Sequence, residues 1–372
     1  MLPVVSNEEL YHRIALTFVK DVGPVRARKL IEEFGTAVNV FGASAKELKR
    51  IDGITETRVK GFKAAEVFEQ AEKELTFAAK HGVSVLWYEE DNYPQRLKNC
   101  ADAPLLLFYR GTADLNAARI AAVIGTRKYT DYGQRLTEGL IKDLEQHPDV
   151  LIVSGLAHGI DTIAHKQAVA SGLPTVGVLG HGLDRIYPAT NKALAKEMLL
   201  NGGLLAEFPS GTLPDRTNFP MRNRIVAGIS DVTVVVESDI KGGAMITARV
   251  ASGYNRDVAA FPGRVYDNKS SGCNALIRTN TAAMITCADD LLEMMNWNKE
   301  KKAKPVQKQL FLQLSADEQK LIDVLQTKDS VHADELLHVT GLSNSQLAAV
   351  LLQLEMQGLV KALPGKHYRT DY

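Results

Sequence analysis

The stretch VLIVSGLAHGIDTIAHKQA (150–168) decides the fold of the central part of this chain. Its first four residues are apolar without alternation, which predicts a strand buried on both faces. The strand ends in Ser154 and Gly155, and Gly159 precedes Asp161, which can cap the helix expected to follow. A buried strand, a glycine-containing turn and a helix in this order form the βα unit of a parallel sheet.

The same alternation extends over residues 82–297. Short apolar runs separated by helical segments predict βαβ units, and right-handed crossovers place the loops after the strands on one edge of the sheet. We therefore predict an α/β domain with a Rossmann-like, doubly wound, mainly parallel sheet. The predicted strands are VSVLWY, PLLLFY, IAAVIG, VLIVSG, TVGVLG, GLLAEF, DVTVVV, VAAFPG and AAMIT.

A separate all-α domain is predicted in front of the sheet, over residues 1–81. Apolar residues recur there at helical spacing, and helix formers fill its second half. Two similar segments, VKDVGPVRARKL (19–30) and RIDGITETRVKGF (50–62), place Gly23 and Gly53 in tight turns before helices with basic first turns.

A small domain is also predicted behind the sheet. Residues 298–312 are basic and polar, as is typical of a linker. Residues 313–372 contain three short amphipathic helices and then a hairpin with its turn at Pro364 and Gly365. Three helices followed by a β-hairpin make a winged helix.

Composition narrows the class of protein. The 372 residues are 45% hydrophobic and 24% charged, the ordinary mixture of a soluble globular protein. The 44 Lys and Arg residues balance 44 Asp and Glu residues, which argues against a polycationic coat protein. A zero net charge does not argue against nucleic-acid binding, because a local basic groove is enough.

Cysteine usage and hydropathy point to the cytoplasm. Cys100, Cys273 and Cys287 lie far apart, so neither a disulfide framework nor a zinc site is expected. No apolar stretch is long enough to span a membrane, and the N-terminus lacks the pattern of a signal peptide. We expect a cytoplasmic protein.

Four glycine-containing loops are candidate binding elements. The first, AAVIGTRKYTDYG (121–133), ends a buried strand at Gly125, where the backbone can approach a ligand. Arg127 adds a charged fork suited to phosphate. The loop is not the GxGxxG of a dinucleotide site, and an ordinary βα turn with a solvated arginine is the alternative.

The second loop lies in the stretch quoted at the start. Ser154 and Gly155 are small residues at a strand end, where backbone donors can stay accessible to an anion. His158 lies in the glycine loop and is the histidine that can face a ligand, whereas His165 lies on the following helix and is expected to be packed or on the surface. A GxSxG nucleophile elbow is absent, which argues against a serine hydrolase.

The third loop, GLLAEFPSGTLPDRTNFPMRNRIVAGISDVTVVVE (203–237), contains Arg216 and runs into a helix that carries Arg222 and Arg224. A phosphate chain at a helix N-terminus gains attraction from the helix dipole and from guanidinium groups. Phe219 beside these arginines can stack on a base.

One of these arginines has an alternative role. The helix can pack under the sheet with Arg224 paired to Glu207 or Glu237. That reading explains one arginine and is weaker for the whole cluster.

The fourth loop, ESDIKGGAMITARVASGYNRDVAAFPG (237–263), joins a strand to a helix through Lys241, Gly242 and Gly243. The glycines allow close backbone approach and the lysine supplies a mobile charge. The loop lacks the GK[ST] of a P-loop, and Thr247 is too far along to hold magnesium, so NTP hydrolysis is not expected.

All four loops follow strands and are expected to converge at one sheet edge. Together they are rich in hydrogen-bond donors and poor in spare carboxylates. Hydrolysis normally needs a positioned base or a metal ligand. We therefore predict a phosphate-binding groove without a metal or cofactor.

The ordered motifs of the chain closely resemble those of the DNA-processing protein A (DprA/Smf) family. The match covers essentially the whole chain and implies a helix-hairpin-helix/SAM-like domain in front of the Rossmann-like domain and a winged helix behind it. The matching segments are VIGTR (123–127), SGLAHGID (154–161), GHGLDRIYPATN (180–191), SGTLPDRTNFPMRNRIVAGIS (210–230), KGGAMITARVA (241–251) and GCNALIRTNTA (272–282).

The resemblance also implies a function. Members of the family bind single-stranded DNA, protect incoming DNA in natural transformation, load the recombinase RecA onto it, and form homodimers through the Rossmann-like domain. Their motif arginine and later basic residue match Arg127 and Lys241. Their SGLA loop lies in the same pocket as the NFPxRNR segment, which here also includes Asn218 and Asn223.

One position departs from the family pattern. Many members carry an arginine where this chain has His158. Histidine is mostly neutral at pH 7, so we expect one phosphate contact to be weaker here.

Two other functions stay open. The glycine motifs also resemble those of nucleotide-processing Rossmann enzymes of the phosphoribohydrolase type. Those enzymes carry a PGGxGTxxE segment, whereas the nearest pair here, KGGAMITA, lacks the glutamate, so we predict a protein that is not an enzyme. The other open function is that of a transcription regulator that senses a nucleotide, and the winged helix is the one feature that supports it.

The terminal domains have two candidate roles each. The glycine turns of residues 1–81 are compatible with phosphate binding or with docking alone. In the winged helix, the segment SNSQLAAVLLQLEMQG is poor in Arg and Lys for a recognition helix, so a protein contact is at least as well supported as a duplex contact.

Overall fold

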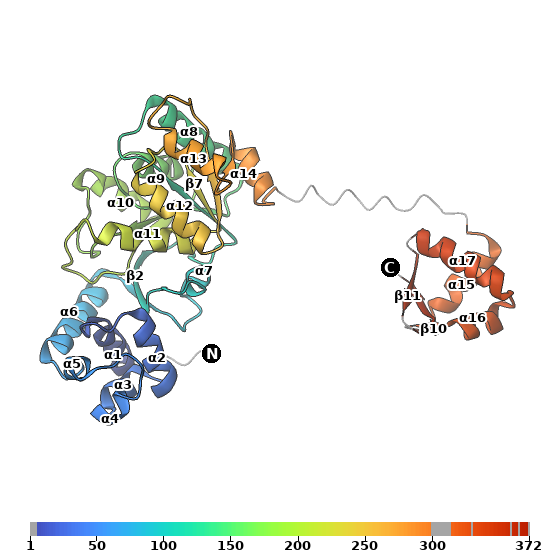
Figure 1. Ribbon diagram of the computed structural model, residues 1–372, viewed down its shortest axis with the longest axis horizontal. Coiled ribbons are helices and arrows are strands. Elements are labelled where there is room, and N and C mark those ends of the chain that lie inside the picture. Colours follow the sequence, from blue (N-terminus) through green and yellow to red (C-terminus); the bar gives the residue numbers. More distant parts are fainter. Residues whose placement is uncertain (1–5, 299–313, 329, 358, 364, 371–372) are drawn as a thin grey trace. The chain divides into compact units, whose positions relative to one another are not determined.

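A nine-stranded sheet forms the centre of the computed structural model, which describes residues 6–298, 314–328, 330–357, 359–363 and 365–370 (Figure 1). Each of the nine predicted apolar runs overlaps one strand. The strands are β1 (Ser84–Trp87), β2 (Leu106–Gly111), β3 (Arg119–Ile124), β4 (Val150–Ser154), β5 (Thr175–Leu179), β6 (Gly202–Ala206), β7 (Val232–Val235), β8 (Asp257–Ala260) and β9 (Ala283–Met284).

The strand order confirms the doubly wound topology. It runs β1-β2-β6-β5-β4-β3-β7-β8-β9, and β3 to β9 pair in parallel. The connections proceed outward in opposite directions from β3 and β7, so the topological switch point lies between these two strands. Strand β2 departs from the parallel pattern, because it pairs antiparallel with both β1 and β6.

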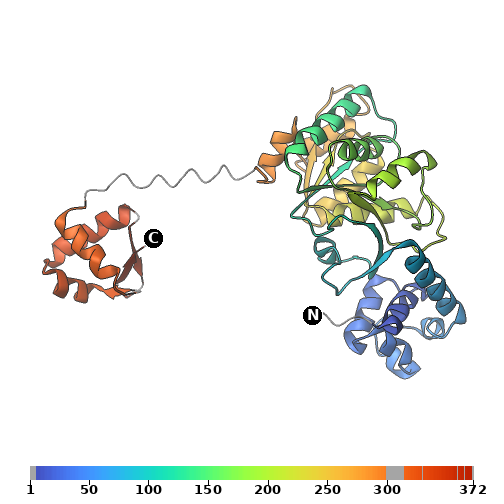
Figure 2. The ribbon, with the colours of Figure 1, turned by 180° about the vertical axis from the view of Figure 1, so that it is seen from behind.

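Both faces of the sheet are buried, which explains the continuous apolar runs. Ile120 and Ile124 of β3 belong to the core on one face, and Ala121 and Val123 belong to the core on the other. Helices α7 (Gln95–Lys98), α11 (Asn218–Ile229), α12 (Gly243–Gly253) and α13 (Ser271–Arg278) cover the first face (Figure 1). The second face, turned forward in Figure 2, is covered by α8 (Asp131–Asp143), α9 (Ile160–Ala170) and α14 (Ala288–Met294), while α10 (Lys192–Met198) packs near β6. Two short 3₁₀ helices, η1 (Leu144–Gln146) and η2 (Ala189–Asn191), complete the set.

The N-terminal helices pack on the β1–β2 end of the sheet. Their apolar core includes Trp87, Leu106 and Phe108 from these two strands, so the helical domain and the sheet share one core. The helices are α1 (Asn7–Phe18), α2 (Pro24–Phe34), α3 (Ala37–Gly42), α4 (Ala45–Leu48), α5 (Glu56–Gly61) and α6 (Ala65–His81).

Of the two predicted glycine turns of this domain, the one at Gly53 is present, whereas Gly23 has extended backbone and follows its turn. Gly23 is the N-cap of α2, and Gly53 has a φ of +82° in the turn before α5. Arg58 ties the turns together, because its Nε donates to the Asp21 carbonyl at 3.0 Å and its guanidinium also donates to the Gly53 carbonyl at 2.7 Å. At least one basic side chain of this repeat therefore serves the fold.

The second compact unit of the chain, residues 300–372, contains the winged helix. Its elements are α15 (Ala316–Leu325), β10 (Val331–His332), α16 (Ala333–Thr340), α17 (Asn344–Met356), β11 (Val360–Leu363) and β12 (His367–Thr370). Strands β11 and β12 form the expected hairpin, and β10 adds a third strand. Residues 299–312 of the predicted linker, and Pro364 of the predicted turn, lie outside the described residues.

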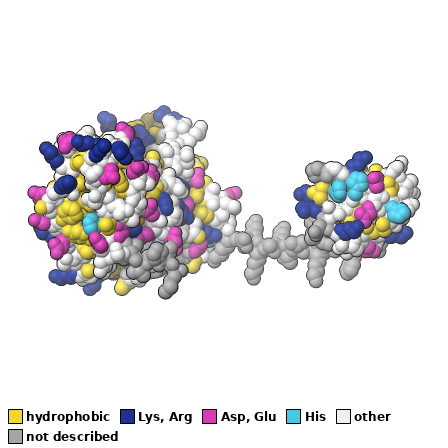
Figure 3. Space-filling model, turned by 90° about the horizontal axis from the view of Figure 1, so that it is seen from below, with side chains coloured by type: hydrophobic (Ala, Val, Ile, Leu, Met, Phe, Trp, Pro, Cys, Tyr) yellow, Lys and Arg dark blue, Asp and Glu magenta, His cyan; other side chains and the backbone are white. Residues whose placement is uncertain are grey.

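The surface of the winged helix is electrostatically mixed. On the face seen in Figure 3, basic side chains are interspersed with acidic side chains and histidines. Within the described part of the whole chain, no helix has both the length and the apolar character needed to cross a bilayer.

Candidate nucleic-acid interface

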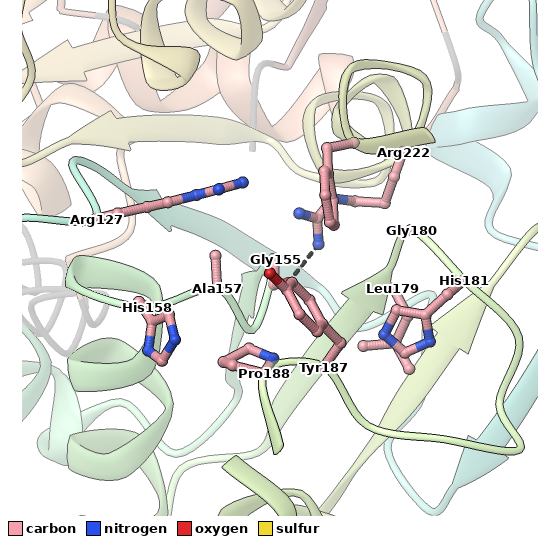
Figure 4. Close-up of a pocket in the computed structure, with 11 residues that line it drawn as sticks. Arg127, Gly155, Ala157, His158, Leu179, Gly180, His181, Tyr187, Pro188 and Arg222 are labelled. Atoms are coloured by element: carbon pink, nitrogen blue, oxygen red, sulfur yellow. Dashed lines mark hydrogen bonds between the residues drawn. The ribbon is translucent and has the colours of Figure 1, made fainter. Parts of the chain in front are cut away.

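The loops after β3, β4, β5 and β7 meet at the carboxyl edge of the sheet, where open α/β sheets bind ligands. They enclose a groove together with the start of α11. We call it the edge groove, and Figure 4 shows part of it. Its lining includes Gly125, Arg127, Gly155, Ala157, His158, His181, Tyr187, Arg216, Phe219, Arg222, Asn223, Gly242 and Gly243.

Gly125 has a packing role that the sequence did not reveal. A Cβ at this position would lie 2.5 Å from Ile160 Cγ1 and 2.9 Å from the Glu237 carbonyl oxygen. The next backbone N–H, of Thr126, donates to that same carbonyl at 2.7 Å. The glycine therefore lets the β3 loop pack between α9 and the segment that follows β7, in addition to any approach of a ligand.

The β4 loop is held by its own helix. Gly159 has a φ of +84°, and a Cβ there would collide with the Thr126 carbonyl. Asp161, in the first turn of α9, accepts hydrogen bonds from the backbone N–H groups of Gly155 (3.2 Å) and Ala157 (3.4 Å). Burial raises the pKa of Asp161, and the charge of Arg222 opposes that shift.

These bonds correct the expectation that the strand end leaves backbone donors free. The N–H groups of Gly155 and Ala157 are taken by Asp161. Ser154 is fully buried and donates its hydroxyl to the Val123 carbonyl at 2.7 Å, so its side chain faces the sheet and not the groove.

Arg222 lies beneath the β4 loop and is only 3% exposed. Its guanidinium donates to the carbonyls of Gly155 (dashed in Figure 4) and Val178. Gly155 has to be glycine, because a Cβ would lie 2.5–2.6 Å from the guanidinium atoms. Burial lowers the pKa of Arg222 to about 10 while Asp161 counteracts the shift, so the side chain stays charged at pH 7.

Arg224 is not among the residues that line the edge groove, and its predicted contact with DNA stays a prediction. It forms an ion pair with Glu207 at 2.5 Å and donates to the Asp102 carbonyl at 2.7 Å. Burial raises the pKa of Glu207, and the charge of Arg224 opposes this rise. The alternative role considered for one of the two arginines of α11, an ion pair with a glutamate, is therefore confirmed for Arg224 and Glu207.

Arg127 is exposed and lies over an aromatic side chain. Its guanidinium carbon is 5.2 Å from the centre of the Phe219 ring, which is a cation–π distance. The Tyr187 ring stacks on the Phe219 ring, with 6.0 Å between the ring centroids and an interplanar angle of 29°. Cation and rings thus form one wall of the edge groove.

Tyr187 is one of the groove residues that were not predicted from the sequence. It lies in the quoted segment GHGLDRIYPATN, after β5, and was not singled out there. The signal that could have found it is its type and position, because an aromatic residue in a loop after a parallel strand is placed at the binding edge. Asn223 also lines the groove, and it accepts a hydrogen bond from Arg222 Nε at 3.1 Å.

The β7 loop supplies glycines and an exposed lysine. Gly242 and Gly243 line the groove at the start of α12, which has no side-chain cap. No atom lies within 4 Å of a Cβ built on Gly243, so this side of the turn is open. Lys241 is exposed one residue earlier, and Asn218 lies at the start of α11, where its amide donates to the Leu213 carbonyl at 3.4 Å.

His165 and Glu237, near the groove, have structural roles. His165 is fully buried, its Nδ1 lies 2.7 Å from Thr175 Oγ1, and burial lowers its pKa to about 3. Glu237 accepts both the backbone N–H (2.9 Å) and the hydroxyl (2.6 Å) of Thr130, the N-cap residue of α8. Within the described ranges, no group of three or more His, Cys, Asp or Glu side chains is arranged to hold a metal ion.

His158 offers a direct test of the groove. It is exposed at the rim, on the same side as Arg127 (Figure 4). Replacing His158 with arginine should strengthen binding of oligo-dT by roughly two- to fivefold at pH 7.5, because an exposed ion pair contributes up to about 1 kcal/mol. Fluorescence anisotropy measures the change. His158→Gln, a neutral control, should bind like the unaltered chain, and equal or weaker binding by the arginine variant would remove His158 from the phosphate path.

Comparison with known proteins places the chain in a family. A family model described as DNA recombination-mediator protein A matches residues 84–296. A DprA winged helix domain model matches residues 305–366, and a SAM-like helix-hairpin-helix tandem model matches residues 14–61. Protein Smf of Synechocystis sp. is 31% identical over 98% of this chain and 99% of its own length.

Solved structures agree with these matches. The X-ray structure of DNA processing protein A from Streptococcus pneumoniae superposes with a TM-score of 0.66 and 33% identity, covering 78% of this chain and 98% of that one. DNA processing protein A from Helicobacter pylori, whose structure addresses its single-stranded DNA binding mode, gives a TM-score of 0.52 and 31% identity over 58% and 96% of the two chains. The chain belongs to the DNA-processing protein A (DprA/Smf) family.

Proposed function

We propose that this chain binds single-stranded DNA along the edge groove. The observation that carries the proposal is that the wall of Arg127, Phe219 and Tyr187 lines the same groove as the open turn of Gly242 and Gly243. A phosphate fits the guanidinium and the uncapped start of α12, and a base stacks on the aromatic rings. Stacking on a ring tolerates any base, which suits a protein that handles DNA without regard to sequence.

The charges around the groove support this reading. Arg127, Arg216 and Lys241 make no ion pair among the described residues, so their charges are available to phosphates. The nearby carboxylates are engaged, since Asp161 holds the β4 loop and Asp239 pairs with Lys269 at 2.9 Å. The structure of the Helicobacter pylori relative, which addresses single-stranded DNA binding, supports the same ligand.

In the cell, we propose that the chain works in DNA processing as a homodimer in the cytoplasm. It would protect incoming single-stranded DNA in natural transformation and load RecA onto it for recombination. Family membership supports this role. A gel-shift series with single-stranded and duplex DNA, with and without RecA, tests it. We expect a complex that migrates more slowly in the gel and forms only when RecA and single-stranded DNA are both present. Its absence would count against RecA loading.

The enzyme alternative has a chemical test of its own. A phosphoribohydrolase needs a carboxylate positioned at the sugar, whereas Glu237 is bound to Thr130. Incubation with nucleoside monophosphates should therefore release no free base. Release of a base in proportion to the amount of protein would favour the enzyme.

Salt dependence tests the phosphate contacts. If three cations neutralise phosphates, the logarithm of the oligo-dT binding constant should fall with the logarithm of salt concentration with a slope of about −2, because bound counterions are released. Titrations at several potassium chloride concentrations give this slope. A flat response would contradict binding through the edge groove.

A further inference from the structure

The exposed aromatic side chains of the described residues gather at one edge of the sheet. Four tyrosines are the most exposed: Tyr129 (45%) and Tyr132 (39%) follow β3, Tyr187 (48%) follows β5, and Tyr266 (99%) follows β8. No phenylalanine or tryptophan in the described ranges reaches a similar exposure. Single exposed aromatic rings scattered over a protein surface are ordinary, whereas several gathered on one surface indicate a binding site.

Three of these tyrosines lie beyond the edge groove. The loop from Thr126 to Thr130 separates that groove from a second hollow, formed by the start of α8 and the loop after β8. Tyr132 donates its hydroxyl to the Pro262 carbonyl at 2.7 Å, which fixes its ring against the β8 loop. Tyr129 stands on the separating loop, and Tyr266 stands at the tip of the β8 loop beside Val265, itself 83% exposed.

Cations accompany these rings. Arg135 and Arg264 line the second hollow, and Lys128 lies on the separating loop. All three are exposed, and none has an ion-pair partner in the described part of the chain. Two carboxylates are also present. Asp131 lies in the first turn of α8, and Asp267 holds its own loop through the Lys269 N–H (2.9 Å) and the Ser270 hydroxyl (3.3 Å).

We propose that this surface is a second subsite for single-stranded DNA, which we call the tyrosine patch (Lys128, Tyr129, Tyr132, Arg135, Arg264 and Tyr266). The proposal rests on the proposed function of the edge groove. A strand leaving that groove at Arg127 crosses the separating loop and enters the second hollow. Tyr129 and Tyr266 stack on its bases, while Arg135 and Arg264 contact its phosphates.

Oligonucleotide length separates the two subsites. An oligo-dT of roughly 4 nucleotides can occupy the edge groove alone, and one of roughly 16 can reach both surfaces. The double variant Tyr129→Ala/Tyr266→Ala should weaken binding of the long oligonucleotide by about tenfold or more and leave the short one unchanged. Fluorescence anisotropy on the full chain measures both constants. Tyr129→Phe/Tyr266→Phe keeps the rings and should bind like the unaltered chain.

Several results would overturn the patch. Unchanged affinity for the long oligonucleotide removes it, and an equal loss for both lengths shows an effect on the fold or on the edge groove. Loss in the phenylalanine variant as large as in the alanine variant rules out stacking. Light scattering tests whether a second copy of the chain occupies this surface instead. If the tyrosine-to-alanine variant changes in molecular mass but not in DNA affinity, the surface is a contact between copies.

Two further variants calibrate the result. Leu200→Ala removes another exposed apolar side chain, 81% exposed just before β6 at the opposite edge, and should change neither constant. Arg127→Ala should weaken both lengths. If it weakens neither, the proposed function of the edge groove fails, whatever the tyrosine variants do.

Discussion

Replacing Arg222 with alanine is expected to lower the free energy of unfolding of the larger unit by about 3–5 kcal/mol. The guanidinium is 3% exposed and supplies the donors for the Gly155 and Val178 carbonyls. Its removal leaves both carbonyls without that donor, leaves a cavity, and takes away the positive charge that faces buried Asp161. Each of these effects destabilises the fold, and they act at one point.

Urea denaturation followed by tryptophan fluorescence measures this loss. The two tryptophans, Trp87 and Trp297, both belong to cores of the larger unit, so the winged helix does not contribute to the signal. Arg216→Ala is the matched control, because this exposed arginine lies six residues earlier in the same segment and should cost less than about 0.5 kcal/mol.

A double variant identifies the cause. If the uncompensated charge of Asp161 dominates, Arg222→Met/Asp161→Asn should recover part of the stability lost in Arg222→Met alone. A loss below about 1 kcal/mol in Arg222→Ala would mean that the buried arginine is dispensable for the fold.

The strands of this fold could be predicted because burial on both faces leaves a strong trace in sequence. Runs such as VLIV (150–153) have no polar face, and a strand of that kind needs helices on both sides. The antiparallel pairing of β2 with β6 could not be predicted in the same way. PLLLFY looks like the other runs, and the direction of a strand depends on long-range pairing that apolar content does not encode.

The location of the site at the edge of the sheet could be predicted from the sequence, but the directions in which its side chains point could not. Arg222 and Arg224 are two residues apart on α11, and positions i and i+2 face different sides of a helix. One therefore points beneath the β4 loop and the other pairs with Glu207, although both looked equally suited to DNA. The sequence alone does not distinguish an arginine that supports the fold from one that binds a ligand. The residues that surround it in the structure do.

Glycines raised a similar ambiguity. Gly155 and Gly125 lie at strand ends, as a ligand site predicts, yet their missing Cβ atoms make room for Arg222 and for Ile160. A glycine in sequence indicates close approach without saying of what. Gly243 lines the groove and has open space around it, so a ligand can approach the backbone there.

Replacing Arg127 with alanine is expected to weaken oligo-dT binding by about 10- to 100-fold. A hydrogen bond between a guanidinium and a phosphate contributes about 1.5–3 kcal/mol, and each 1.4 kcal/mol changes the dissociation constant tenfold. Arg127 also lies 5.2 Å from the Phe219 ring, so its removal takes away a group that can hold the ring in place for a base. The salt slope should become shallower by about 0.7, the share of one phosphate contact on a single strand.

This loss can be assigned to the groove because Arg127 does little for the fold. It is exposed and forms no ion pair in the described part of the chain, so the variant should unfold at the same urea concentration as the unaltered chain. Arg110→Ala is the control, since this exposed arginine lies near the end of β2, which runs antiparallel to β6 and therefore ends at the opposite edge of the sheet. Lys241→Ala should give a smaller loss, because a lysine binds phosphate as a mobile point charge. Unchanged affinity in both Arg127→Ala and Lys241→Ala would mean that the DNA follows another surface.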